Sequence, residues 1–100
     1  MEITKELNQG TLKVSLDGRL DTMTSPQLET ELGDVENINH LIFDFDKIEY
    51  ISSAGLRLLL KLDETLTDKN GDMKIIHVHP LVKEIFDITG FTDMLQIEME

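Results

Sequence analysis

The chain has 100 residues, a formal net charge of −11 and no cysteine. This length suffices for one domain with a single hydrophobic core, but not for a second domain beside it. The net charge argues against direct binding to nucleic acid or anionic membranes, because both need clusters of Lys and Arg that the sequence lacks. Without cysteine, disulfides, thiolate catalysis and thiolate metal sites are excluded.

The N-terminal residues have none of the features of a targeting or membrane segment. Residues 1–6 lack the basic region and the apolar core of a signal peptide, and no apolar run approaches the roughly 20 residues of a membrane-spanning helix. We therefore expect a cytoplasmic protein that does not insert into membranes and whose partners are other proteins.

The first third of the chain predicts a β-hairpin and a short helix. Residues 1–7 and 11–16 are separated by turn-forming residues, and apolar and polar side chains alternate in the second segment, as in a half-buried strand. Ser25 is typical of a helix N-cap and Pro26 of the first helical position. The expected helix ends at Gly33.

A strand followed by a helix is predicted in the middle of the chain. Residues 41–45 are apolar apart from Asp44, which indicates a buried strand. Four small residues (52–55) then start a leucine-rich helix. The charged side chains of this helix fall on one stripe opposite its leucines, at Arg57, Lys61, Glu64 and Asp68. We interpret this stripe as the solvated face of the helix, of which only Arg57 lies beside the serines.

The last third predicts a strand, a helix and a final short strand. A turn at 68–72 precedes a strand at 73–78, and Pro80 begins a helix that ends with Gly90 as its C-cap. The last strand is expected near 95–97. The predicted apolar face of the helix consists of Leu81, Val82, Ile85, Phe86 and Ile88.

The order β-β-α-β-α-β-α-β predicts an α/β fold, in which an N-terminal antiparallel hairpin joins a mixed, partly parallel central sheet with helices packed on it. Binding sites in such sheets lie at the carboxyl ends of the parallel strands. Asp21 and Ser53 both fall in strand-to-helix loops of this kind, which makes them candidate site residues.

The two serines at the start of the central helix allow three interpretations. Where a strand delivers hydroxyls to the first turn of a helix, free backbone N–H groups favour an anion, which points to phosphorylation. Ser52 and Ser53 could instead only cap the helix. A catalytic serine is disfavoured, because no glycine stands two residues before either serine and none of the three histidines has the context of a triad base.

Three groups of side chains have the composition of metal sites, but each has a simpler interpretation. His77 and His79 lack an obvious third ligand, so we interpret them as strand-end residues. Asp44 and Asp46 share one strand face and could hold Mg²⁺, although a solvated strand end is favoured. Residues 68–72 resemble a calcium loop with a misplaced glycine and no closing glutamate, which indicates a turn. We expect no metal and no cofactor.

Three short motifs resemble those of the STAS domain family, and within it the anti-sigma-factor antagonists. Residues 18–21 (GRLD) resemble the G-x-L-D segment of the family, and residues 50–56 (YISSAGL) resemble its D-S-[ST]-G-L region. Residues 88–91 (ITGF) are similar to its closing T-G-[LF]. Together the motifs span nearly the whole chain, so the resemblance implies the STAS fold.

The resemblance also implies a non-enzymatic protein that regulates transcription through phosphorylation. In the family, a serine kinase that doubles as an anti-sigma factor phosphorylates the serine matched by Ser53, and a metal-dependent phosphatase removes the phosphate. The unphosphorylated form binds the kinase and frees the sigma factor, whereas the phosphorylated form is released. Asp21 matches an acidic residue beside that serine. The implied partner-binding residues are Asp21, Thr22, Ser52, Ser53, Ala54, Gly55 and Arg57.

Two departures from the family pattern affect these expectations. Ser52 stands where many members have Asp, which removes one carboxylate beside the acceptor and adds a competing hydroxyl. Many members also continue into a C-terminal helix, so we expect a single STAS domain over residues 1–100 without that full helix. An alternative within the family is a transporter-associated or small-molecule-sensing module that uses the loops around Asp21 and Ser53.

Overall fold

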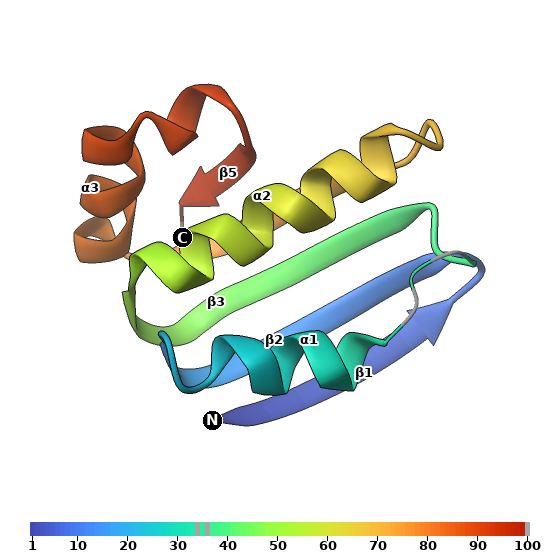
Figure 1. Ribbon diagram of the computed structural model, residues 1–100, viewed down its shortest axis with the longest axis horizontal. Helices are drawn as coiled ribbons and strands as arrows, with labels where there is room; N and C mark the ends of the chain where they lie inside the picture. The colour runs from blue at the N-terminus through green and yellow to red at the C-terminus, as the bar shows by residue number, and fades with distance from the viewer. Residues whose placement is uncertain (34, 36, 100) are drawn as a thin grey trace.

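The computed structural model describes residues 1–33, 35 and 37–99, and its helices and strands follow the predicted order (Figure 1). In chain order they are β1 (Glu2–Asn8), β2 (Thr11–Leu20), α1 (Ser25–Leu32), β3 (His40–Ile51), α2 (Ser53–Thr67), β4 (Asp72–Val78), α3 (Pro80–Thr89), the 3-10 helix η1 (Phe91–Asp93) and β5 (Gln96–Met99). The predicted C-cap at Gly90 is confirmed, with a left-handed φ of 82°. No helix within the described residues has both the length and the apolar character needed to cross a membrane.

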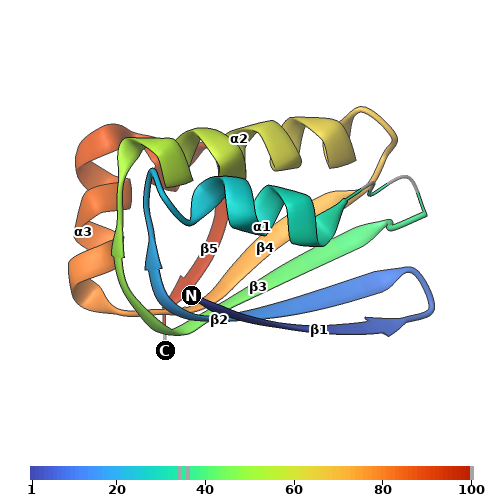
Figure 2. The same cartoon turned by 60° about the horizontal axis from the view of Figure 1, so that its bottom comes forward.

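The five strands form one mixed sheet in the order β1-β2-β3-β4-β5. β1 and β2 form the predicted antiparallel hairpin, and the other neighbouring strands are parallel. In Figure 2, α1 and α2 lie across one face of the sheet, and α3 stands at the end where β3 and β4 finish. The predicted α/β fold is therefore confirmed. Because β2 and β3 are parallel neighbours, their carboxyl ends come together at one edge of the molecule.

The hydrophobic core lies between the sheet and the helices. Leu12, Val14 and Leu16 are buried, because the alternation along β2 turns all three to the same face. The largest fully buried side chains are Phe43, Phe45, Phe86, Leu20, Leu28, Leu41, Ile48, Ile51, Leu59, Leu66, Met73 and Ile75. The rings of Phe45 and Phe86 stack with their centroids 6.4 Å apart, which joins α3 to β3. Burial of each such side chain contributes roughly 1.5–3 kcal/mol to folding.

β3 is longer than the sequence pattern predicts. Beyond the apolar run it continues through Asp46, Lys47 and Glu49, whose side chains are exposed, to Ile51. The second half of the strand is held by backbone pairing with β2 across two register shifts, which apolar alternation cannot reveal. One shift lies next to Gly18, whose φ of 128° is a conformation that glycine readily adopts. In Figure 2 both strands bend here, towards the helices.

The start of α1 differs from the prediction. Ser25 is not the N-cap, because Thr24 occupies that position and Ser25 is the first helical residue. Ser25 is only 6% exposed, and its hydroxyl is buried without a hydrogen-bond partner in the described structure. The helix begins one residue early because the Thr24 side chain is already held by hydrogen bonds with the Asp21 N–H and the Arg19 carbonyl oxygen.

The apolar face of α3 is narrower than the helical spacing predicts. Leu81 and Ile88 are 73% and 78% exposed, although both were assigned to the buried side. The helix packs on the end of the sheet rather than along its face, so Val82 and Phe86 are the residues it buries. The prediction for the two exposed residues is therefore wrong.

Candidate functional site

The candidate site forms where the ends of β2 and β3 meet the starts of α1 and α2. Leu20 pairs with Ile51 in the parallel ladder, and the Ser52 backbone N–H donates to the Leu20 carbonyl oxygen at 2.9 Å. This hydrogen bond joins the last residue of β2 to the residue before α2. Figure 2 shows the two loops rising beside each other at this end of the sheet. Asp21 and Ser53 thus lie on neighbouring loops, as expected from the parallel topology.

The two serines at the start of α2 differ in accessibility. Ser52 is the N-cap: its backbone is extended, and its carbonyl oxygen accepts the Leu56 N–H at 3.0 Å. Its side chain makes no capping hydrogen bond, and the hydroxyl is buried without a partner among the described residues. Ser53 is the first helical residue and is exposed. The capping interpretation therefore holds for the backbone of Ser52 but not for its hydroxyl.

Gly55 allows α2 to approach the ends of both strands. A Cβ atom at this position would lie 2.8 Å from Cγ1 of Ile51 and 2.9 Å from the carbonyl oxygen of Leu20. Carbon atoms pack at about 3.5–4.0 Å, so any larger residue would push the helix away. The glycine of the sequence motif is thus required by packing, and it sets the position of Ser53 relative to the β2 end.

The loop after β2 is folded around the Asp21 carboxylate. Asp21 Oδ1 accepts the backbone N–H groups of Met23 at 3.0 Å and Thr24 at 3.1 Å. The Thr24 hydroxyl accepts the Asp21 N–H at 2.9 Å and donates to the Arg19 carbonyl at 2.7 Å. The side chain of Asp21 therefore determines the shape of the loop, in the manner of an Asx turn.

The same contacts keep Asp21 ionised. The hydrogen bond from the Thr24 backbone N–H lowers the pKa of the Asp21 carboxyl, while partial burial acts in the opposite direction. The Met23 N–H, the Thr24 hydroxyl and the Arg19 guanidinium add to the lowering, and the pKa lies below its usual value. A negative charge therefore remains beside the serines throughout the physiological pH range.

Three exposed side chains at this end were not identified from the sequence. The Arg19 guanidinium lies 4.8 Å over the ring of Tyr50 and 3.9 Å from Asp21 Oδ2. Met23, in the loop shaped by Asp21, is 84% exposed. The pairing of Arg19 with Tyr50 follows from the register after the second bulge, which the sequence does not reveal. Met23 could have been identified from the sequence, because it is an apolar residue in a turn that otherwise consists of polar residues.

A shallow groove of about 340 Å³ separates α1 from α2 beside the serines. Its lining residues are Thr22, Ser25, Pro26, Glu29, Ala54, Arg57, Leu58 and Lys61. Lys61 Nζ pairs with Glu29 Oε2 at 2.5 Å and so links the two helices. Arg57 is exposed, and it has no hydrogen bond or ion pair within the described part of the chain. The structure thus places the predicted residues Asp21, Thr22, 52–55 and Arg57 at one end of the molecule.

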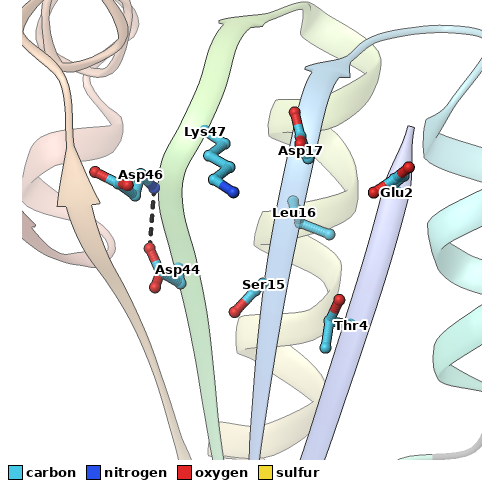
Figure 3. Close-up of a pocket in the computed structure, with 8 residues that line it drawn as sticks. All are labelled: Glu2, Thr4, Ser15, Leu16, Asp17, Asp44, Asp46 and Lys47. Atoms are coloured by element: carbon cyan, nitrogen blue, oxygen red, sulfur yellow. Dashed lines mark hydrogen bonds between the residues drawn. The ribbon is translucent and has the colours of Figure 1, made fainter.

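A second concavity, of about 280 Å³, lies on the sheet away from the serines (Figure 3). It is lined by Glu2, Thr4, Ser15, Leu16, Asp17, Asp44, Asp46 and Lys47. Asp44 Oδ1 accepts the Asp46 N–H at 2.9 Å and lies 3.0 Å from His77 Nδ1, while His79 contacts the Asp46 carbonyl. In Figure 3 the Asp46 carboxylate is turned away from that of Asp44. Among the described residues, no three His, Cys, Asp or Glu side chains are grouped to hold a metal ion.

Comparison with known proteins identifies the family. The family model for the STAS domain matches residues 2–100. The chain belongs to the STAS domain family. It is 30% identical over 99 residues to BtrV of Bordetella bronchiseptica, which is named as an anti-sigma factor antagonist, covering 97% of this chain and 85% of BtrV.

Two solved structures share the fold of this STAS domain. The Bacillus cell fate determinant SpoIIAA in its phosphorylated form superposes with a TM-score of 0.76 at 18% identity, covering 99% of this chain and 93% of that one. A sulfate transporter family protein of Wolinella succinogenes has a TM-score of 0.78 at 14% identity, covering 94% of this chain and 80% of that one. At these identities the likeness establishes the fold alone.

Replacement of Gly55 by alanine tests the packing at the site. We expect Gly55→Ala to destabilise the protein by about 1–3 kcal/mol, the usual cost of overpacking, because the new methyl group meets the Leu20 carbonyl oxygen. Urea unfolding measures the loss. Ser53→Ala, at an exposed position two residues earlier, is the control and should unfold within about 0.5 kcal/mol of the parent protein. Equal stability of the Gly55→Ala variant and the parent would show that the close approach is not required.

Replacement of Asp21 by asparagine tests the charge in the loop. Because the folded pKa of Asp21 is lowered, its ionised form stabilises the protein above the unfolded pKa of about 3.9, and this stabilisation is lost as the pH falls through the folded pKa. Asp21→Asn should therefore be less stable than the parent at pH 7, with a difference that shrinks below about pH 3.9. Urea unfolding at several pH values measures this. Asp93→Asn, an exposed carboxylate without a side-chain contact in the described structure, is the control, and a difference that is constant with pH would contradict the assignment.

Proposed function

We propose that this STAS domain is an anti-sigma-factor antagonist whose binding to its partner is switched by phosphorylation of Ser53. The partner is an anti-sigma factor that is also a serine kinase, and a metal-dependent phosphatase resets the switch. The observation that supports this most strongly is the difference between the two serines. Ser53 is exposed on the first turn of α2, whereas the Ser52 hydroxyl is buried.

Accessibility favours Ser53 as the acceptor. In the transfer, the Ser53 hydroxyl oxygen attacks the γ-phosphorus of ATP, a new O–P bond forms, and the bond to the ADP oxygen breaks. The hydroxyl proton passes to a base of the kinase. This in-line attack requires a kinase to surround the acceptor oxygen, which the burial of the Ser52 hydroxyl prevents. Ser52, which replaces the usual Asp of the family motif, therefore does not compete for the phosphate.

The electrostatics of the site account for a switch. A phosphate adds a charge of about −1.5 to −2 to a surface where the Asp21 carboxylate is already ionised. The free N–H groups of the first turn of α2 favour the added charge, so the helix and the fold remain intact. A partner that binds this end of the domain has to desolvate both the phosphate and the Asp21 carboxylate. Because this desolvation costs free energy, the phosphorylated domain is released.

The proposed docking surface combines the loop after β2 with the start of α2. It includes Asp21, Thr22 and the exposed Met23 side chain from the loop, and residues 52–55 and Arg57 from the start of α2. An exposed methionine is a flexible apolar contact of the kind that recurs in protein-binding surfaces. In this role the domain binds and is modified, and catalyses no reaction itself.

A second candidate is a transporter-associated or small-molecule-sensing module. The groove between α1 and α2, at about 340 Å³, falls within the size range of small-ligand sites and borders Thr22 and Arg57. The shared fold with a transporter family protein is consistent with this use. A neighbouring transporter gene, rather than a kinase or phosphatase gene, would favour this candidate.

Phosphorylation by the cognate kinase tests the proposed function. We expect incubation with the kinase and ATP to place one phosphate on Ser53, detected by mass spectrometry of the peptide that contains residues 52–57 with fragmentation to assign the serine. The Ser52→Ala variant should be phosphorylated like the parent, because it removes a buried hydroxyl without a partner. Ser53→Ala should accept no phosphate. A phosphate on Ser52, or none on the parent, would contradict the proposal.

A further inference from the structure

The two arginines of this acidic chain both lie at the candidate site. Arg19 is next to last in β2 and Arg57 lies one turn into α2. The Arg19 guanidinium is already engaged, because it lies over the Tyr50 ring and near Asp21. Arg57 is exposed and, within the described residues, forms no hydrogen bond, ion pair or ring contact. The chain thus keeps one unengaged guanidinium beside the serines.

The helical spacing directs Arg57 towards Ser53. Residues four apart on a helix lie on the same face with their Cβ atoms about 5–6 Å apart. Ser53 and Arg57 have this spacing, and both are exposed. The next cation along the stripe, Lys61, is occupied by Glu29 at 2.5 Å. A guanidinium presents a planar set of N–H donors that matches two oxygens of a phosphate.

We propose that Arg57 binds the phosphate on Ser53 within α2, so that a single modification adds an anion and also removes an accessible guanidinium from the docking surface. The proposal rests on the proposed function for the presence of that phosphate. Unmodified, the domain offers Arg57 to an acidic group of its partner. In the phosphorylated domain, Arg57 pairs with the phosphate on its own helix. The partner then loses its contact with the Arg57 guanidinium and is also repelled by the phosphate.

The surrounding charges make this pairing the favoured one. The groups that face this end are Arg19 at the end of β2, Asp21 from the loop after it, Glu29 from α1, and Arg57 and Lys61 from α2. Asp21 repels a phosphate, Arg19 is held by Asp21 and Tyr50, and Glu29 neutralises Lys61. Arg57 is therefore the cation that can offset the repulsion from Asp21 without breaking an existing contact.

A ³¹P NMR titration of the full chain tests this without a kinase. Phosphoserine is incorporated at position 53 during translation, so this test does not depend on a kinase. Failure of a kinase to modify Ser53 would count against the proposed function but not against the pairing with Arg57. We expect Arg57→Gln to raise the second pKa of the phosphate by about 0.3 units relative to the parent, the equivalent of one i,i+4 ion pair. Arg57→Lys should raise it by less, and Lys61→Gln should leave it unchanged.

A second readout separates direct binding from a general charge effect. In ¹⁵N-labelled protein, the Arg57 Nε–H signal should shift on incorporation of phosphoserine 53, because its guanidinium then donates to the phosphate. The Arg19 Nε–H signal should shift less. Equal phosphate pKa values in the parent and Arg57→Gln, or a shift confined to Arg19, would overturn the proposal.

Discussion

The site depends on the parallel pairing of β2 with β3, closed by the hydrogen bond from the Ser52 N–H to the Leu20 carbonyl. This contact brings the Asp21 loop to the start of α2. It leaves so little space that only glycine fits at position 55, where a methyl group would meet the same carbonyl oxygen. The Leu20 carbonyl oxygen thus accepts the hydrogen bond from Ser52 and also limits how closely α2 can approach β2. The exposed position of Ser53 follows from this geometry.

The two consecutive serines at the start of α2 differ in accessibility, with a buried hydroxyl on Ser52 and an exposed residue at Ser53. The chain turns from strand to helix between them, so Ser52 faces inward as the N-cap and Ser53 faces solvent in the first turn. Ser52 therefore places neither a charge nor an accessible hydroxyl at this position. The remaining carboxylate, Asp21, is provided by the neighbouring loop and is kept ionised by its own hydrogen bonds.

Much of the fold was predictable because it depends on local patterns. Alternation in residues 11–16, the leucine-rich stripe of α2 and the C-cap at Gly90 each predicted the element that the structure contains. The second half of β3 was missed, since its buried residues Ile48 and Ile51 are separated by exposed pairs instead of alternating with single exposed residues, and the register shifts against β2 break the regular pattern. The burial of the Ser25 and Ser52 hydroxyls, and the Arg19–Tyr50 contact, depend on tertiary packing and register, about which one sequence carries little information.

We propose that phosphate on Ser53 breaks the contact with the partner while leaving the fold intact. Titration calorimetry of the cognate anti-sigma factor with the unmodified chain, and with the chain carrying phosphoserine at position 53, measures this most directly. We expect the phosphorylated chain to bind at least about tenfold more weakly, or by roughly 1.4 kcal/mol, with an unchanged circular dichroism spectrum. Equal or tighter binding of the phosphorylated form would contradict it.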